Sequence, residues 1–167
     1  MSPSRTAAGE AATSVILSTF RLNGLLLDAG DRLSADHGLT SARWQVLGAI
    51  ALSDRPLTVP QIARRMGLTR QSVHATVDRL VGSGLIELIP NDDHVRSPLV
   101  RLTPPGEEAY RVLDREQAGW VSKLARDIPG SDLERTRAVL EELVRRLETS
   151  RADDRGSPRV GAGREER

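Results

Sequence analysis

A short stretch of polar and small residues carries side chains that could recognise the edges of nucleic-acid bases. The set comprises Thr69, Arg70, Gln71, Ser72, His74, Ala75, Thr76 and Arg79. Arginine can pair with guanine, glutamine with adenine, and small side chains can approach a thymine methyl group. The apolar Val73, Val77 and Leu80 recur among them at the spacing of one buried helix face. The polar set is therefore predicted to face outward, where the side chains of an isolated helix would simply be solvated.

Acid–base chemistry is a second use to consider for the same stretch. Ser72, His74 and Asp78 lie close together, and the last two are four residues apart. A catalytic triad depends on side chains that converge on a substrate cleft, which three residues of one exposed helix do not. We therefore expect no enzyme activity.

Metal binding has weaker support. Asp36 with His37, and His94 with the two aspartates before it, could supply oxygen and nitrogen ligands. Neither pair has the HxxxH or cysteine spacing of typical zinc sites. No metal site and no cofactor is predicted, although a metal-responsive protein remains an alternative.

Helix caps around this stretch set out the elements that position it. Thr40, Thr58 and Thr69 each follow a leucine that can pack on the helix as a hydrophobic staple, and Gln61 completes a capping box with Thr58. Gly67 can take the positive φ that ends a helix. The pattern predicts three short helices, the last two joined by the tight turn of a helix-turn-helix.

A β-hairpin is predicted directly after these helices. Residues 85–89 and 99–102 are rich in strand-forming side chains, and residues 90–93 have turn chemistry. Pro98 cannot donate to a ladder and belongs at the start or edge of the second strand. The loop holds His94, Arg96 and Ser97. An arginine at such a tip could enter a minor groove, although a flexible surface arginine is the commoner outcome.

The chain resembles the multiple-antibiotic-resistance regulator (MarR) family of bacterial transcription factors over roughly residues 13–147. The matching segments are 39–47, 62–68, 77–80, 84–86 and 96–103. The family wing has Asp and Lys two positions before and after its Arg, where this chain has His94 and Pro98. The resemblance carries over Arg96 as a wing contact and leaves His94 open between phosphate contact and loop structure.

The resemblance implies a mostly α fold with a small β wing, a winged helix-turn-helix with N- and C-terminal dimerisation helices. It implies a homodimer that binds a pseudo-palindromic double-stranded operator, represses a nearby promoter and is released by a small organic ligand, often an aromatic acid. The family's ligand pocket would lie near His37, Arg43 and Trp44, and Trp44 is more often a core residue in such a position. A protein-interaction module without specific DNA binding is a further alternative, and Arg70, Gln71 and Arg79 argue against it.

The remaining sequence defines the boundaries. We expect disorder in residues 1–10, a dimerisation helix in 11–37, the DNA-binding lobe in 38–103, C-terminal dimerisation helices in 104–149 and a disordered tail in 150–167. Thr103 and Pro104 begin a helix expected to reach Ile128, and leucines of residues 133–147 recur every three or four positions. Such a seam could equally pack within its own domain.

Composition agrees with a soluble, cytoplasmic protein. The 167 residues carry a net charge of +1. They contain no cysteine, which excludes disulfides and thiol redox sensing. No apolar run is long enough to span a membrane. Residues 58–103 hold six arginines against four acidic residues. This small excess favours moderate, salt-sensitive binding to DNA.

Overall fold

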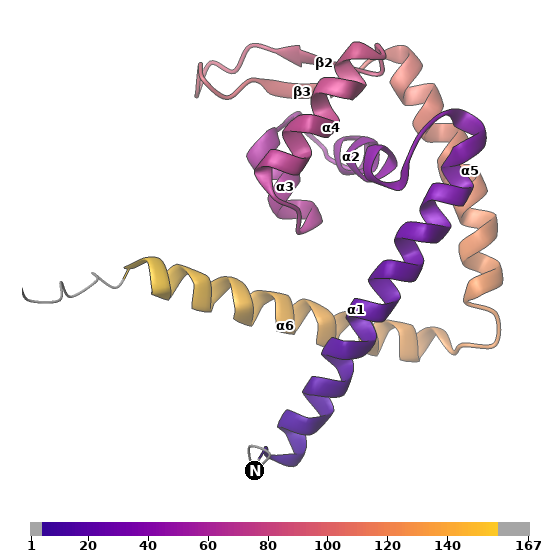
Figure 1. Ribbon diagram of the computed structural model, residues 1–167, viewed down its shortest axis with the longest axis vertical. Coiled ribbons are helices and arrows are strands. Elements are labelled where there is room, and N and C mark those ends of the chain that lie inside the picture. The colour runs from indigo at the N-terminus through magenta and orange to yellow at the C-terminus, as the bar shows by residue number, and fades with distance from the viewer. Residues whose placement is uncertain (1–4, 157–167) are drawn as a thin grey trace, which may run out of the picture. The chain divides into compact units, whose positions relative to one another are not determined.

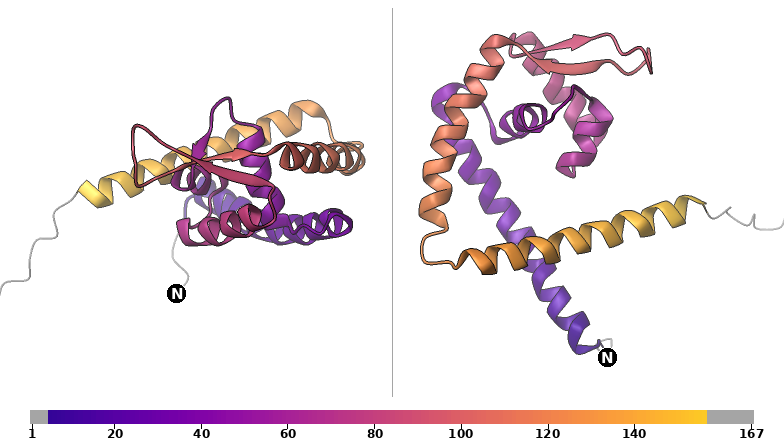
Figure 2. Two further views of the ribbon diagram at one scale, coloured as in Figure 1. Left: turned by 90° about the horizontal axis from the view of Figure 1, so that it is seen from above. Right: turned by 180° about the vertical axis from the view of Figure 1, so that it is seen from behind.

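Three short helices and a hairpin follow one another in the order that the caps and turns predict. The computed structural model describes residues 5–156. Its central elements are α2 (Ser41–Ala51), β1 (Leu57–Thr58), α3 (Val59–Met66), α4 (Arg70–Gly82), β2 (Ile86–Ile89) and β3 (Leu99–Leu102). Figure 1 shows α3 and α4 side by side beneath the hairpin, and Figure 2 shows the hairpin extending past these helices. The prediction of a winged helix-turn-helix is confirmed.

The predicted caps are present at the starts of these helices. The Thr69 hydroxyl accepts from the Ser72 amide at 3.1 Å, and the Gln61 side-chain oxygen accepts from the Thr58 amide at 2.8 Å. Gly67 takes a φ of +64° between α3 and α4, a conformation that costs glycine little. The turn closes with a 2.9 Å bond from the Leu68 amide to the Ala63 carbonyl. Local chemistry therefore fixes the spacing between the two helices.

The sheet has one more strand than the sequence suggests. β1 pairs with β3, giving the antiparallel order β1-β3-β2, and Val100 lies opposite both Leu57 and Leu88. A strand of two residues is too short to show any alternation of side chains, so it could not be read as one. As a result β3 is central, and Pro98 lies just before its first residue.

One hydrophobic core joins the helices to the sheet. The fully buried side chains come from every element of the lobe except β1, and from one outer helix: Val46, Leu47, Ile62, Val73, Val77, Leu80, Ile86, Val100 and Leu113. Burying such a side chain contributes about 1.5–3 kcal/mol. The exposed face of α4 is thus held by the packing of its opposite face.

Long helices flank this lobe. α1 (Ala7–Ser34) leads through the short 3-10 helix η1 (Ala35–His37) into α2, and α5 (Pro104–Leu124) follows β3. α1 packs on α2 where Gly30 meets Ser41. The expectation of disorder is wrong for residues 7–10, which are helical, because the Thr6 hydroxyl accepts from the Gly9 amide and caps the helix.

The chain divides into two compact units, residues 1–121 and 122–167, and the second contains α6 (Gly130–Gly156). α5 ends at Leu124, four residues before the predicted Ile128, and Asp127 takes a φ of +66°. Residues 150–156 continue α6 where a disordered tail was predicted, so that boundary is also wrong.

Residues 1–4 and 157–167 lie outside the described part. Within residues 5–156, no helix is both long and apolar enough to cross a membrane.

Candidate nucleic-acid interface and adjoining cavity

The predicted base-reading residues lie together along the exposed face of α4. Seven of the eight are exposed: Thr69, Arg70, Gln71, Ser72, His74, Ala75 and Arg79. The opposite face of the helix carries the buried Val73, Val77 and Leu80. One face of α4 is therefore free to enter a groove while the other anchors it to the core.

Thr76 does not belong to this exposed set. Its side chain is only 7% exposed, and its hydroxyl donates to the Ser72 carbonyl at 3.0 Å. Position 76 lies three residues after Val73 and four before Leu80, so helical geometry places it on the inward face. The prediction that Thr76 faces outward is wrong.

The arginines of this surface differ in whether a protein carboxylate already neutralises them. Within residues 5–156, Arg70, Arg79 and Arg96 form no ion pair with the chain. Arg101, on the same hairpin as Arg96, binds Glu87 through Nε at 2.9 Å and through Nη2 at 2.7 Å. The three unpaired arginines can offer their full charge to a phosphate backbone, whereas the charge of Arg101 is already balanced by Glu87.

The wing loop is shaped by a buried asparagine that the sequence did not single out. The Asn91 side-chain amide donates to the Ser97 carbonyl at 2.7 Å. The backbone of His94 donates to the Asn91 carbonyl at 3.1 Å and accepts from the Ser97 amide at 2.8 Å. The backbone of His94 thus structures the loop, while its side chain and that of Arg96 remain exposed at the tip.

Comparisons with known proteins agree with this geometry. A model described as MarR family matches residues 37–97. The uncharacterized protein Rv2011c of Mycobacterium tuberculosis is 39% identical over 137 residues, covering 82% of this chain and 94% of the relative. The chain belongs to the MarR family. It is a MarR-family transcription regulator with a winged-helix DNA-binding fold.

Solved MarR-family structures share this fold. The transcriptional regulator MosR of M. tuberculosis, solved in complex with DNA, is 24% identical with a TM-score of 0.68, covering 81% of this chain and 97% of that one. CouR of Rhodococcus jostii RHA1, solved with p-coumaroyl-CoA, is 21% identical with a TM-score of 0.66 and covers 77% and 88% of the two chains.

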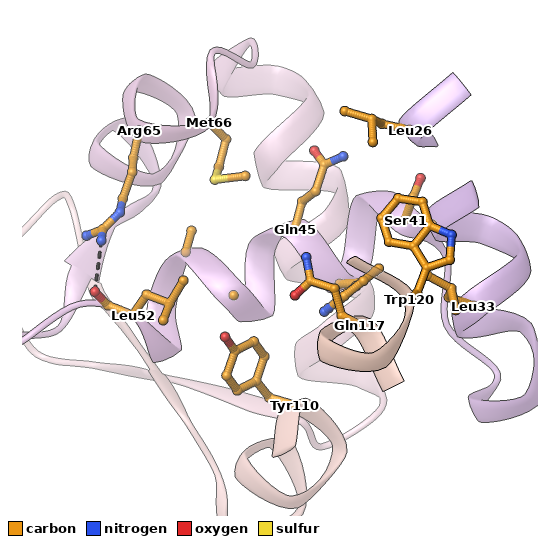
Figure 3. A pocket seen from close by; sticks show the side chains of 14 residues that line it. Leu26, Leu33, Ser41, Gln45, Leu52, Arg65, Met66, Tyr110, Gln117 and Trp120 are labelled. Atoms are coloured by element: carbon orange, nitrogen blue, oxygen red, sulfur yellow. Dashed lines mark hydrogen bonds between the residues drawn. The ribbon is translucent and has the colours of Figure 1, made fainter. Parts of the chain in front are cut away.

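A cavity of about 300 Å³ adjoins the DNA-binding lobe of this MarR-family chain. It lies between α1, α2, the end of α3 and α5, and its lining includes Trp44, Gln45, Arg65, Tyr110, Gln117 and Trp120. Figure 3 shows the labelled side chains converging on this space from separate helices. Because Arg65 and its neighbour Met66 both line the cavity, an occupant would touch α3, the helix that precedes α4.

The predicted pocket residues are only partly in this cavity. Trp44 lines it and also packs against the core. His37 and Arg43 are not in the lining. His37 Nε2 lies 3.0 Å from a Glu116 carboxylate oxygen, and Arg43 donates to the Gly38 carbonyl at 3.3 Å.

Five lining residues that matter chemically were missed: Gln45, Arg65, Tyr110, Gln117 and Trp120. Burial raises the pKa of the Tyr110 phenol, and the charge of Asp114 and a 3.4 Å hydrogen bond to it act in the same direction. Tyr110 therefore presents a neutral phenol at physiological pH. Among residues 5–156, no group of three or more His, Cys, Asp or Glu side chains could hold a metal ion.

Proposed function

We propose that the protein is a homodimeric regulator that binds a pseudo-palindromic operator and represses a nearby promoter in the cytoplasm. The observation that carries this proposal is the exposed face of α4 and the wing, where Arg70, Arg79 and Arg96 have no ion-pair partner in the described chain. MosR, which shares the fold, was solved with DNA. The proposal assigns the protein no enzyme activity.

Uncovered apolar side chains support a dimer. On α1, Leu17 and Phe20 are 62% and 69% exposed, and on α6 Leu147 is 66% exposed. Large apolar patches left open on a soluble chain usually mark a surface that a partner covers. A second copy of the same chain would cover them and hold two recognition helices at the spacing of two half-sites.

Release by a small organic ligand is supported by the cavity beside α3 and by CouR, which was solved with p-coumaroyl-CoA. A ligand can act only through different affinities for the DNA-competent and DNA-incompetent states. Linkage then requires DNA to weaken ligand binding by the factor with which ligand weakens DNA binding.

The proposal is tested on the DNA that flanks the gene. We expect the full chain to bind one fragment there as a dimer, with affinity falling steeply as salt rises because phosphate contacts release counterions. A promoter–reporter fusion then measures the direction of regulation. Reporter activity that rises when the gene is deleted indicates repression, a fall indicates activation, and absence of any bound fragment would contradict the proposal.

Recognition-helix substitutions should change sequence preference. We expect Arg70→Ala or Gln71→Ala to weaken operator binding by about 1–3 kcal/mol each, if either residue makes a bidentate base contact. The loss should be smaller on operators already altered at the contacted base. Affinities measured across single-base variants decide, and an unchanged base profile in both mutants would remove these residues from readout.

The wing offers a matched pair of arginines. Arg96→Ala should lower operator affinity severalfold, and more so where the DNA beneath the wing is rich in A·T pairs, whose minor groove is narrow and negative. Arg101→Ala is the control, because Glu87 already neutralises that guanidinium. Equal binding by the parent and Arg96→Ala proteins at physiological salt would show that the wing stays outside the groove.

A further inference from the structure

Two carboxamide side chains in the cavity have no hydrogen-bond partner in the described chain. Gln45 of α2 and Gln117 of α5 both line the cavity and are half-buried. Figure 3 shows both among the side chains around the cavity. Each carboxamide offers a donor and an acceptor, and its unpartnered polar atoms remain accessible to an occupant of the cavity. The pair is therefore suited to a ligand whose polar edge both donates and accepts.

Aromatic rings bound the same space. Trp44 and Tyr110 are half-buried and packed against the hydrophobic core, and Trp120 approaches from the same helix as Gln117. Aromatic side chains prefer offset-stacked or edge-to-face contacts with other rings. A volume of about 300 Å³ lies at the lower end of the range for small-molecule sites, so a flat molecule of two fused rings suits it.

The charges around the cavity do not favour an anion. Arg65 is the only cationic side chain in the lining, it is exposed, and its Nη2 already donates to the Leu52 carbonyl at 2.8 Å. Two carboxylates that are not in the lining hydrogen-bond to residues that are. Asp31 accepts from the Ser41 amide at 2.6 Å, and Asp114 accepts from the Tyr110 hydroxyl at 3.4 Å. An ionised carboxylate in a largely apolar site is strongly disfavoured unless a free cation pairs with it.

The lining does not favour a cation either, because it contains no Asp or Glu side chain. We infer that the cavity takes an uncharged, flat aromatic molecule with a donor–acceptor edge, such as an aromatic amide or lactam, in preference to an aromatic acid. Gln45 and Gln117 bind the polar edge, and the indole and phenol rings cover the faces. This inference rests on the proposed ligand-responsive function and names the chemistry of its effector.

Two probes of nearly equal shape separate the alternatives: 1-naphthamide and 1-naphthoate. Isothermal titration calorimetry on the full-length protein measures both affinities. We expect the carboxamide to bind at least about tenfold more tightly than the carboxylate, since only the carboxamide satisfies both glutamines without an unpaired charge. The double substitution Gln45→Leu with Gln117→Leu should remove most of this preference. Neither glutamine has a protein partner to lose, so thermal melting should show the variant folded.

The opposite result has its own signature. Naphthoate binding as tightly as naphthamide, with that affinity lost in Arg65→Gln, would overturn the inference and make Arg65 the anion site. Arg64→Gln is the matched control, because Arg64 precedes Arg65 on α3 and does not line the cavity. Absence of binding by both probes would also overturn the inference.

Operator titrations distinguish these failures from failure of the proposed function. The unliganded protein is first titrated with its operator, and the titration is repeated with each probe. Operator binding by the unliganded protein, together with absence of probe binding in calorimetry, overturns the ligand chemistry alone. Absence of operator binding in the unliganded protein overturns the proposed function itself, whichever probe the cavity prefers.

Discussion

Deletion of residues 131–167 is expected to abolish tight operator binding while leaving the winged-helix lobe folded. The deletion removes nearly all of α6, including the exposed Leu133, Val139, Val144 and Leu147. The core of the lobe contains no residue of this segment, so the lobe should remain intact. Losing the link between two half-site contacts typically lowers affinity by about 10²–10⁴-fold. Sedimentation and operator titration measure both parts of the prediction.

The control removes only residues 151–167, which follow the last exposed leucine of α6. That shorter deletion should leave both sedimentation and operator affinity close to those of the parent. A stable dimer formed by the longer deletion would show that α6 contributes no essential contact and would leave α1 as the dimer surface. A lobe that unfolds in the longer deletion would show that α6 is needed for more than pairing.

Features decided by neighbouring residues could be predicted from the sequence. The hydroxyl caps at Thr58 and Thr69 and the turn at Gly67 each depend on a few adjacent positions. The buried stripe on α4 follows from helical period alone. That period also shows why Thr76 was misplaced, since positions 73, 76, 77 and 80 all lie on one side of a helix. Thr76 was placed in the outward set for its residue type, although its position in the helix puts it on the inward side.

The cavity could not be predicted in the same way. Gln45 and Gln117 come from helices far apart in the sequence, and only the packing of α2 and α5 brings their side chains to one space. Arg43 was predicted, with Trp44, from where the family resemblance places the ligand pocket. Adjacent residues on a helix point about 100° apart, however, and Arg43 instead faces the Gly38 carbonyl. The wing bond from Asn91 depends on a loop closure that no local pattern indicates.

The start of α5 is hydrogen-bonded to the segment between α4 and β2. The Thr103 hydroxyl donates to the Gly84 carbonyl at 2.6 Å and accepts from the Gly106 amide at 3.2 Å, while the Thr103 amide donates to the Leu85 carbonyl at 3.1 Å. These bonds fasten the first turn of α5 to the segment that follows the recognition helix. A Cβ at Gly106 would lie 1.9 Å from the Leu85 carbonyl oxygen, far inside van der Waals contact.

Gly106→Ala is therefore expected to destabilise the protein by about 3 kcal/mol, since a backbone carbonyl cannot move aside as a flexible side chain can. In a chain of this size that corresponds to a fall in Tm of roughly 6–12 °C. Gly119→Ala is the matched control on the same helix, because its Cβ would meet nothing within 4 Å. Gly119→Ala should stabilise the protein by about 0.5–1 kcal/mol, because alanine favours the helix more than glycine does. Thermal melts of the two variants beside the parent decide, and a Gly106→Ala protein as stable as the parent would show that α5 does not approach the Leu85 carbonyl so closely.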